Sequence, residues 1–443
     1  MWGESVRRMV GRLVHQYVDL WWEDADSVRD PGITFSKREQ GEREGHLARF
    51  LDAVTGELQS VPQTRSERLV VQERILSAFE ILARSALGFE DRHLEILLNR
   101  GFTEAGTSFV QTAGLFDPSI GGASVFQAIR NVWAMNGLQM LLGLPVRLTP
   151  AVFAYSMLYP YTDNFLDDPS IPGETKARFN ERFAQRLAGE PVAPLNSQEQ
   201  PIWDLLGLIE GQYSRSEFPH VFESLLAIHR AQEKSLRLLH RDASPNEVDV
   251  LGIAIEKGGT SVLADGYLVA GSLTPAQAEF LFGYGAFLQL ADDLQDVRGD
   301  LDSGLLTVFS QAANHWPLDA LTDKAFDFAH RVLPRVESFA PGGPAPLKEL
   351  MARSARTVLI NAVGRSGRFF TESYRRSAEA RSPFRFAFLK KCRRRLARQR
   401  VSLTRLVGAF ALAADAEAPF ALPGKATSPQ AEEAAGSDPR LHA

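Results

Sequence analysis

Two clusters of aspartates, each embedded in apolar helical sequence, are the residues whose types and spacing could do chemistry. The first lies in SMLYPYTDNFLDDPS and contains Asp163, Asp167 and Asp168. The second lies in FLQLADDLQDVRGD and contains Asp292, Asp293, Asp296 and Asp300. Residues four apart share one face of a helix, so two carboxylates in each cluster project together and repel each other by about 0.2–0.5 kcal/mol. A divalent cation would remove that repulsion.

The predicted helix ends make the repulsion worse. Pro169 disfavours helix at Asp168, and Gly299 predicts that the second helix ends just after Asp296. Both clusters would then lie at the negative end of a helix dipole. Oxygen ligands with no neighbouring His or Cys favour Mg²⁺, which completes its coordination with water and substrate phosphates. The clusters therefore suggest a Mg²⁺–diphosphate site between two helices, although either cluster alone could be a solvated helix end.

The elements that would position these clusters are helices. Apolar residues recur three and four positions apart in four long runs, at 69–87, 124–144, 221–241 and 275–297. Proline- and glycine-containing turns separate the runs, and alternating strand patterns are nearly absent. The sequence therefore predicts an all-α fold.

The domain prediction follows from the same patterns. It has an N-terminal helical extension at 1–68 and one helical domain at 69–413. A tail at 414–443 is rich in Ala, Pro, Ser and Glu, and is predicted to be disordered because it cannot bury enough apolar surface.

Composition excludes several classes of protein. The chain has 443 residues, of which 44% are apolar and 23% charged, typical of a globular protein. A single cysteine, Cys392, excludes a disulfide framework and a zinc site built on several thiolates. The net charge of −5 argues against nucleic-acid binding. No apolar run is long enough to cross a membrane and the first residues do not resemble a secretory signal, so we expect a cytoplasmic location.

Charge is concentrated in a basic block near the C-terminus. Residues 365–405 hold 14 Lys and Arg against two acids, a balance of 14 − 2 = +12 that leaves −5 − 12 = −17 for the remainder. The block could be a solvated face, or a peripheral surface that contacts anionic lipid. A third interpretation places its early part, with Tyr374 and Arg375, over the mouth of the active site.

The second cluster resembles a family motif. It is similar to the second aspartate-rich motif of the trans-prenyl diphosphate synthases, F-Q-x-x-D-D-x-x-D, although Phe287 lies one residue further from Gln289 than in that motif. The first cluster is similar to the looser first motif of the class I terpene synthases and large-terpene synthases. Lys257, in EKGGTS, resembles the diphosphate-binding lysine of prenyl synthases, and Gln232 resembles their cavity glutamine. The resemblance covers residues 110–310 and implies the class I isoprenoid synthase fold, a helical bundle around a central apolar cavity.

The sequence also departs from the elongating synthases. It has no GGKRxR motif, no RRG after the first aspartate cluster, and Gly304-Leu305 where those enzymes have Gly-Lys. The missing cations normally bind a second diphosphate, so their loss argues against ordinary chain elongation.

The resemblance thus implies a Mg²⁺-dependent class I terpene synthase that ionises a linear prenyl diphosphate and releases diphosphate as the carbocation cyclises or rearranges. Several Mg²⁺ ions would be held by Asp163, Asp167, Asp168, Asp292, Asp293 and Asp296. The expected diphosphate ligands are Lys257, Arg298, Lys176, Arg178, Arg130 and Arg375. The expected cavity residues are Tyr159, Phe165, Gln232, Tyr267, Phe287 and Gln289.

Two alternatives remain open. The chain could be a prenyltransferase that elongates a prenyl diphosphate or couples two of them, or a non-catalytic family member that binds isoprenoid lipid. Helical synthases of this type are often homodimers, so a homodimer is a further expectation.

Overall fold

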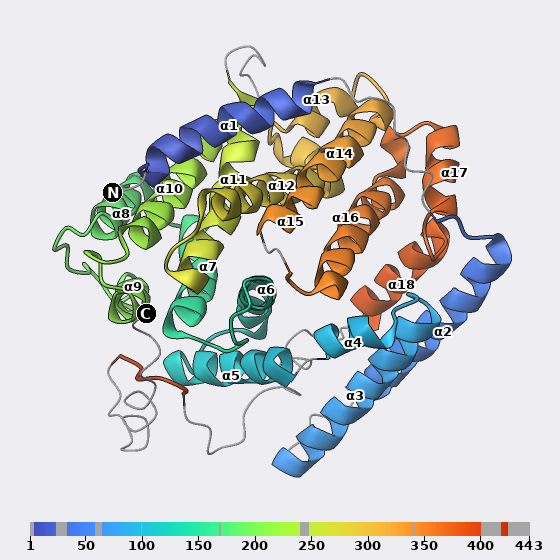
Figure 1. The fold of residues 1–443 in the computed structure, drawn as a ribbon, viewed down its shortest axis with the longest axis horizontal. Helices are drawn as coiled ribbons and strands as arrows, with labels where there is room; N and C mark the ends of the chain where they lie inside the picture. Colours follow the sequence, from blue (N-terminus) through green and yellow to red (C-terminus); the bar gives the residue numbers. More distant parts are fainter. Residues whose placement is uncertain are drawn as a thin grey trace.

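The computed structural model describes residues 4–23, 33–57, 64–98, 100–167, 170–239, 248–339, 342–399 and 418–423. Every regular element within these ranges is a helix, so the all-α prediction is confirmed for the part of the chain that is described (Figure 1). The first ten helices are α1 (Val6–Trp22), α2 (Lys37–Glu57), α3 (Arg65–Ser85), α4 (Asp91–Leu97), α5 (Arg100–Phe116), α6 (Gly122–Leu141), α7 (Pro150–Asp167), α8 (Gly173–Leu187), α9 (Gln200–Gln212) and α10 (Pro219–Ser235). They are followed by η1 (Leu236–Leu239), α11 (Val250–Ala270), α12 (Pro275–Ser303), α13 (Val308–Ala313), α14 (Asp319–Val332), η2 (Leu333–Arg335), α15 (Val336–Phe339), α16 (Ala345–Arg365), η3 (Gly367–Phe369), α17 (Glu372–Ala380) and α18 (Phe386–Gln399).

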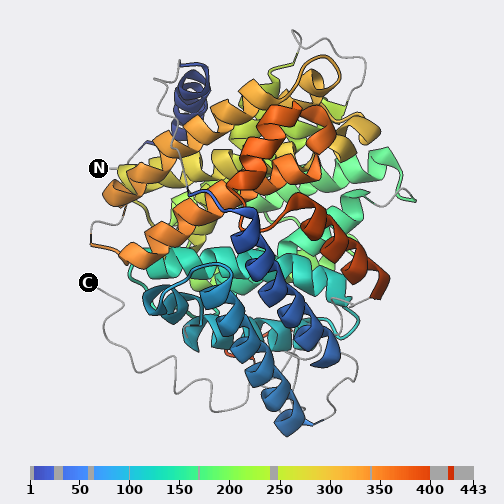
Figure 2. The same cartoon turned by 90° about the vertical axis from the view of Figure 1, so that its right-hand side faces the viewer.

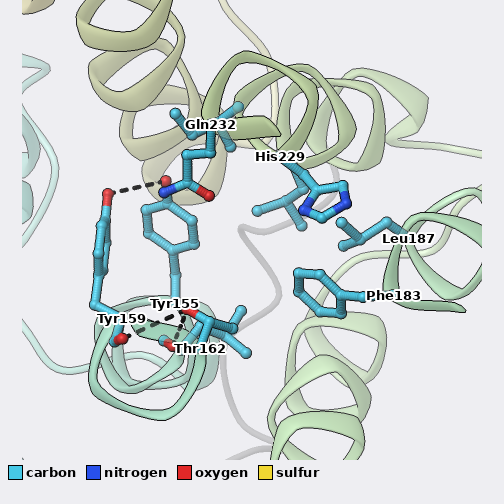
Figure 3. A pocket seen from close by; sticks show the side chains of 10 residues that line it. Tyr155, Tyr159, Thr162, Phe183, Leu187, His229 and Gln232 are labelled. Atoms are coloured by element: carbon cyan, nitrogen blue, oxygen red, sulfur yellow. Dashed lines mark hydrogen bonds between the residues drawn. The ribbon is translucent and has the colours of Figure 1, made fainter. Parts of the chain in front are cut away.

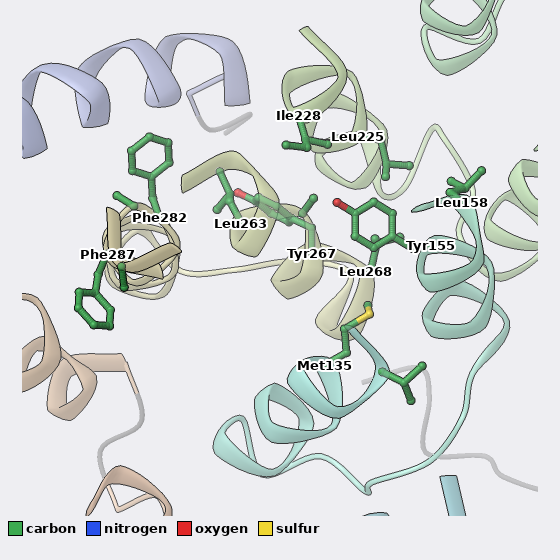
Figure 4. Close-up of a cluster of buried hydrophobic side chains, with 14 of the residues drawn as sticks. Met135, Tyr155, Leu158, Leu225, Ile228, Leu263, Tyr267, Leu268, Phe282 and Phe287 are labelled. Atoms are coloured by element: carbon green, nitrogen blue, oxygen red, sulfur yellow. The ribbon is translucent and has the colours of Figure 1, made fainter. Parts of the chain in front are cut away.

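The pair α11 and α12 forms the centre of the molecule. Helices α6, α7 and α10 pack against α11, and α14 and α16 pack against α12. Buried side chains from α6, α7, α10, α11 and α12 form one continuous apolar cluster (Figure 4). Because α11 and α12 contact most of the surrounding helices, their side chains decide where polar groups can sit inside the bundle.

Glycines allow α11 and α12 to approach closely. A Cβ on Gly258 would collide with the carbonyl oxygen of Gly285, and a Cβ on Gly285 would collide with that of Gly258. Two adjacent glycines inside a helical run, as at Gly258 and Gly259, indicate either a helix break or a close backbone approach. The structure has the close approach, and α11 continues unbroken through both glycines.

The prediction that the second helix ends just after Asp296 is wrong. Helix α12 continues to Ser303 and is capped by Gly304, which has a left-handed backbone with φ +77°. Gly299 lies within the helix, where its missing side chain meets open space. The buried side chains of Leu294 and Val297 pack against the core and stabilise this part of the helix, so the helix continues through Gly299 despite the low helix propensity of glycine.

Both termini of the described chain pack against this core. Helix α1, in the predicted N-terminal extension, lies across α10, α11 and α12, and its Tyr17 hydroxyl donates to the carbonyl oxygen of Glu279 at 2.8 Å (Figure 1). In the predicted disordered tail, only 418–423 lie among the described residues. There the Phe420 ring sits 5.7 Å from that of Phe153, a contact that the composition of the tail did not indicate.

Helices α2 and α3 pack side by side at one edge of the molecule (Figure 2). They contact the basic helix α18 through a small apolar cluster that includes Leu82 and Phe384. Two cations of α18 and of the loop before it are paired with acids of α2: Arg385 with Glu44, and Arg395 with Asp52. Part of the basic block therefore holds α2 in place.

Candidate functional site

The second aspartate cluster lies on the C-terminal half of α12. Asp292 and Asp296 share the exposed face of the helix, whereas Asp293 is 7% exposed and Asp300 is 9% exposed. Gln289, one turn earlier, donates to Oδ1 of Asp293 at 2.8 Å. Oδ2 of Asp300 is buried without a hydrogen-bond partner among the described residues. The cluster therefore has an exposed pair and a buried pair of carboxylates.

Three of these carboxylates, Asp292, Asp293 and Asp300, have a raised pKa and hold their protons more tightly than free aspartate. Burial raises the pKa of Asp293 to about 7, although the hydrogen bond from Gln289 opposes the rise. Burial also raises the pKa of Asp300 to about 6, and the nearby charges of Asp296 and Asp292 add to it. Asp292 reaches solvent, but neighbouring side chains partly desolvate its carboxylate, and this desolvation and then repulsion from Asp296 raise its pKa. A bound cation would stabilise the ionised form of all three carboxylates and lower their pKa values.

Cations from three other helices approach this cluster. Arg130 of α6, Lys257 of α11 and Arg365 of α16 each act on the charge of Asp292 and lower its pKa. Arg365 makes direct contact, with Nη2 3.4 Å from Oδ1 of Asp296 and Nη1 3.4 Å from Oε1 of Gln295. The structure therefore brings Arg130 and Lys257, two of the predicted diphosphate ligands, to the acidic face. Arg365 was missed as a site residue, since in the sequence it is only the first member of the basic block.

The other predicted cations lie elsewhere. Arg298 is exposed on α12, with Nε 3.9 Å from Oδ2 of Asp302. Lys176 and Arg178 lie on α8, and Arg178 is exposed. Arg375 lies on α17 against Gly367. None of the four has a described contact with Asp292, Asp293, Asp296 or Asp300.

The first aspartate cluster can be placed only by its backbone. The side chains of Asp163 and Asp167, in the last turns of α7, lie outside the described residues, as does the whole of Asp168. Helices α7 and α11 run antiparallel, because Asn131 bridges Ser156 to Asp265 while Tyr159 contacts Ser261.

That register can be extended by one turn. Position 156 of α7 lies level with position 265 of α11, and position 159 lies level with position 261. One further turn along each helix brings position 163 of α7 level with Lys257 of α11. The backbone of the first cluster therefore lies at the same level of the α7–α11 pair as Lys257, whose charge lowers the pKa of Asp292 in the second cluster.

A second polar group, which sequence reasoning missed, lies deeper between α6, α7 and α11. Asp265 is 3% exposed, and Nδ2 of Asn131 donates to its Oδ1 at 3.3 Å. Burial raises the pKa of Asp265 to about 8, although the Asn131 hydrogen bond opposes the rise. This carboxyl is therefore mostly protonated at neutral pH. In the sequence it is a lone aspartate in GGTSVLADGYLVA, with no motif to mark it.

A small pocket lies beside this buried group, between α7, α8 and α10 (Figure 3). Its volume is about 40 Å³. The hydroxyl groups of Tyr155 and Tyr159 stand 3.3 Å apart in its wall, and the Tyr159 hydroxyl is 3.0 Å from Oγ of Ser261. The residues that line it are Tyr155, Leu158, Tyr159, Thr162, Phe183, Leu187, Leu225, Ile228, His229 and Gln232.

Two of the six predicted cavity residues, Tyr159 and Gln232, share this pocket. Phe165, Tyr267 and Phe287 are buried in the apolar core and do not line it, and Phe287 points away from Phe282 on the other side of α12 (Figure 4). Gln289 instead binds Asp293.

The donor set of α12 suits Mg²⁺ in its chemistry. It consists of carboxylate oxygens, includes the unpartnered Oδ2 of Asp300, and has no thiol or imidazole. Within the described ranges, no group of three or more His, Cys, Asp or Glu side chains is arranged to hold a metal ion. Mg²⁺ commonly takes only one or two carboxylates and fills its remaining positions with water and phosphate, so Asp292 and Asp296 could each supply one ligand.

Comparisons with protein-family models, with curated proteins and with solved structures find no match for this chain. Among the helices of the described ranges, none is both long and apolar enough to cross a membrane.

Proposed function

We propose that this chain is a Mg²⁺-dependent class I terpene synthase that ionises a linear prenyl diphosphate. The observation that carries the proposal is the acidic face of α12, where Asp292 and Asp296 are approached by cations from three separate helices. Aspartates on a helix surface with no cations around them would simply be solvent-exposed side chains. Acids surrounded by arginine and lysine, some of them desolvated, match a site that binds both a metal and an anion.

The roles follow from the chemistry of the groups. Lys257 and Arg130 would hold the oxygens of the diphosphate through charge-assisted hydrogen bonds, and Arg365 would leave Asp296 to join them. Asp292, Asp293 and Asp296 from α12 and Asp163, Asp167 and Asp168 from α7 would hold Mg²⁺. When bound, Mg²⁺ neutralises the charge that develops on a departing diphosphate.

The apolar side of the pocket between α7, α8 and α10, with Leu158, Phe183 and Leu187, would receive the prenyl chain and keep bulk water from the carbocation. Ligand pockets for molecules of this size are about 300 Å³ or more. The pocket seen here is far smaller, at about 40 Å³, so binding would have to widen it. Aromatic faces such as that of Tyr159 would stabilise the cation by about 0.5–2 kcal/mol.

The test measures diphosphate release by purified protein. Geranyl, farnesyl, geranylgeranyl and longer diphosphates would be supplied with Mg²⁺, with and without isopentenyl diphosphate, and products identified by mass spectrometry. A hydrocarbon or alcohol from a single substrate supports the proposal. A longer diphosphate that forms only with isopentenyl diphosphate would make the chain a prenyltransferase, and no release with any substrate would overturn the proposal in favour of non-catalytic binding.

Matched variants on α12 sharpen the test. Asp292→Asn and Asp296→Asn should each lower kcat by about 10²–10³-fold, the usual cost of removing one group that stabilises transition-state charge. Asp302→Asn is the control, because Asp302 is an exposed aspartate of the same helix whose Oδ2 lies 3.9 Å from Nε of the exposed Arg298. Equal kcat values in all three variants and the parent would exclude the acidic face from catalysis.

A further inference from the structure

The pocket between α7, α8 and α10 has a polar side and an apolar side. Its polar groups are the hydroxyls of Tyr155, Tyr159 and Thr162, the imidazole of His229 and the amide of Gln232 (Figure 3). Its apolar groups are Leu158, Phe183, Leu187, Leu225 and Ile228. A cavity meant only for a hydrocarbon would not need the polar side, because buried polar groups cost free energy unless they are hydrogen-bonded.

The polar side has hydrogen-bonding capacity left over. The side-chain amide of Gln232 has no hydrogen-bond partner among the described residues, and it reaches toward the Tyr155 and Tyr159 hydroxyls (Figure 3). Oγ1 of Thr162 donates to the carbonyl oxygen of Leu158 at 2.8 Å, which leaves its lone pairs as acceptors. Donors and acceptors therefore converge on one small space.

The size of the space fits water. One water molecule needs at least about 10–15 Å³ by this measure, and two to four polar partners. The pocket volume of about 40 Å³ has room for a few water molecules.

The position of the pocket relates it to the acidic site. Tyr159 lies one helical turn before Asp163 on α7, and its partner Ser261 lies one turn after Lys257 on α11. One turn of α-helix is about 5.4 Å long. A prenyl chain whose diphosphate is held at the level of Lys257 would thus extend its first carbons toward the pocket.

We propose that this pocket holds ordered water, and that this water ends the reaction by adding to the carbocation, so that the product is a terpene alcohol. The inference rests on the proposed function. A lone pair of the water oxygen forms the new C–O bond to the cationic carbon, which gives an oxonium. The oxonium passes one proton to His229, and the neutral alcohol and an imidazolium remain.

His229 is placed to accept that proton. Its Nε2 lies 3.1 Å from the carbonyl oxygen of Asn180, which can only accept, so Nε2 carries the hydrogen and Nδ1 keeps its lone pair. Burial lowers the pKa of His229, although the charge of Glu233 and the hydrogen bond to Asn180 oppose the shift, and the lowered pKa favours the neutral ring that can accept a proton. The imidazolium then returns its proton to solvent.

The test runs the reaction in H₂¹⁸O and analyses the products by mass spectrometry. The parent protein should release an alcohol that carries one ¹⁸O. Gln232→Leu, which keeps the size but removes the amide, should lower the alcohol-to-hydrocarbon ratio at least tenfold while diphosphate release continues. Tyr159→Phe should shift the ratio in the same direction, and it provides a second variant if Gln232→Leu fails to fold.

Tyr161→Phe is the matched control. Tyr161 lies on the same helix, but its hydroxyl donates to Asp117 at 2.7 Å and does not line the pocket, so the product ratio should stay as in the parent. A high-resolution crystal structure gives a readout independent of turnover, and should show water bound to Gln232 and Tyr159.

The outcomes separate the two proposals. Diphosphate release with only hydrocarbon products, or an alcohol whose oxygen does not come from water, would overturn the water proposal and leave the synthase proposal standing. A dry pocket in the crystal would also overturn the water proposal. Absence of diphosphate release with every substrate would overturn both.

Discussion

The neighbouring helices α11 and α12 each carry buried carboxyl groups, and the two surroundings differ in charge. On α12, the aspartates at 292–300 lie near Lys257, Arg130 and Arg365, and part of the cluster reaches solvent. On α11, Asp265 is sealed among neutral groups, with Asn131 as its hydrogen-bond partner. Burial is the largest cause of a raised pKa in both places.

This difference in surrounding charge means that the aspartates of α12 could bind charged ligands, whereas Asp265 is a neutral group that stabilises the packing of the helices. Around α12, negative groups are compensated by cations that could be exchanged for a metal and an anion. Around Asp265, no cation contributes to the pKa, so the carboxyl lowers its cost of burial by keeping its proton. A raised pKa alone therefore does not mark the reactive centre, and the surrounding charges decide which role a buried aspartate can have.

The largest expected effect on stability comes from the close backbone contact between α11 and α12, which holds the two carboxyl regions together. In Gly285→Ala, the new methyl would meet the Gly258 carbonyl, which is backbone and cannot rotate away. The free energy of unfolding, measured in urea, should fall by about 3 kcal/mol, the upper end for overpacked cores.

The control for this variant is on the same helix. A Cβ on Gly299 meets nothing within 4 Å, so Gly299→Ala should raise the free energy of unfolding by about 0.5–1 kcal/mol. Equal tolerance of alanine at both positions would mean that α11 and α12 are not in backbone contact, and the relation between the two carboxyl regions would be lost.

A smaller effect distinguishes the two regions directly. Asp265→Ala removes the acceptor of the buried Asn131 amide, and should lower the free energy of unfolding by about 2 kcal/mol. Asp292→Ala removes a repulsion with Asp296 on an exposed face, and should change stability by less than about 0.5 kcal/mol, with a gain as the expected sign. If Asp292→Ala cost as much as Asp265→Ala, the acids of α12 would be structural, and the case for a binding site there would fail.

Sequence patterns predicted the helices and the acids of α12 because both are local properties. Helical periodicity is set by residues a few positions apart, and the motif around Asp292 lies within one helix. The prediction that α12 stops after Asp296 was wrong because packing of its apolar face outweighs the weak propensity penalty of Gly299.

The missed residues depend on contacts between distant segments. Asn131 and Asp265 are separated by 134 residues, and Arg365 and Asp296 by 69. Nothing local distinguishes Asp265 from an exposed aspartate, or Arg365 from the other arginines of the basic block. Their roles follow only from the way α6, α7 and α16 surround the central pair.

The last and smallest effect is a difference in how stability depends on pH. The pKa of Asp265 is about 8 in the folded protein and about 4 when unfolded, so between these values the native state binds more protons. Stability from this group is therefore lost as pH rises, by at most about 1.4 kcal/mol per pH unit. Asp293 acts with the same sign, but most of its contribution ends near pH 7, the value of its own pKa.

Between pH 7 and 8 the two groups can be separated by urea unfolding. Because the side chain of Asp265→Asn cannot ionise, the free energy of unfolding of this variant should decline much less between pH 7 and 8 than that of the parent. In Asp293→Asn, most of the parent's decline should remain. A decline as steep in Asp265→Asn as in the parent would mean that the Asp265 carboxyl is ionised or hydrated at neutral pH. The sealed, neutral character that separates it from the acids of α12 would then be wrong, and both regions would have to be treated as charged sites.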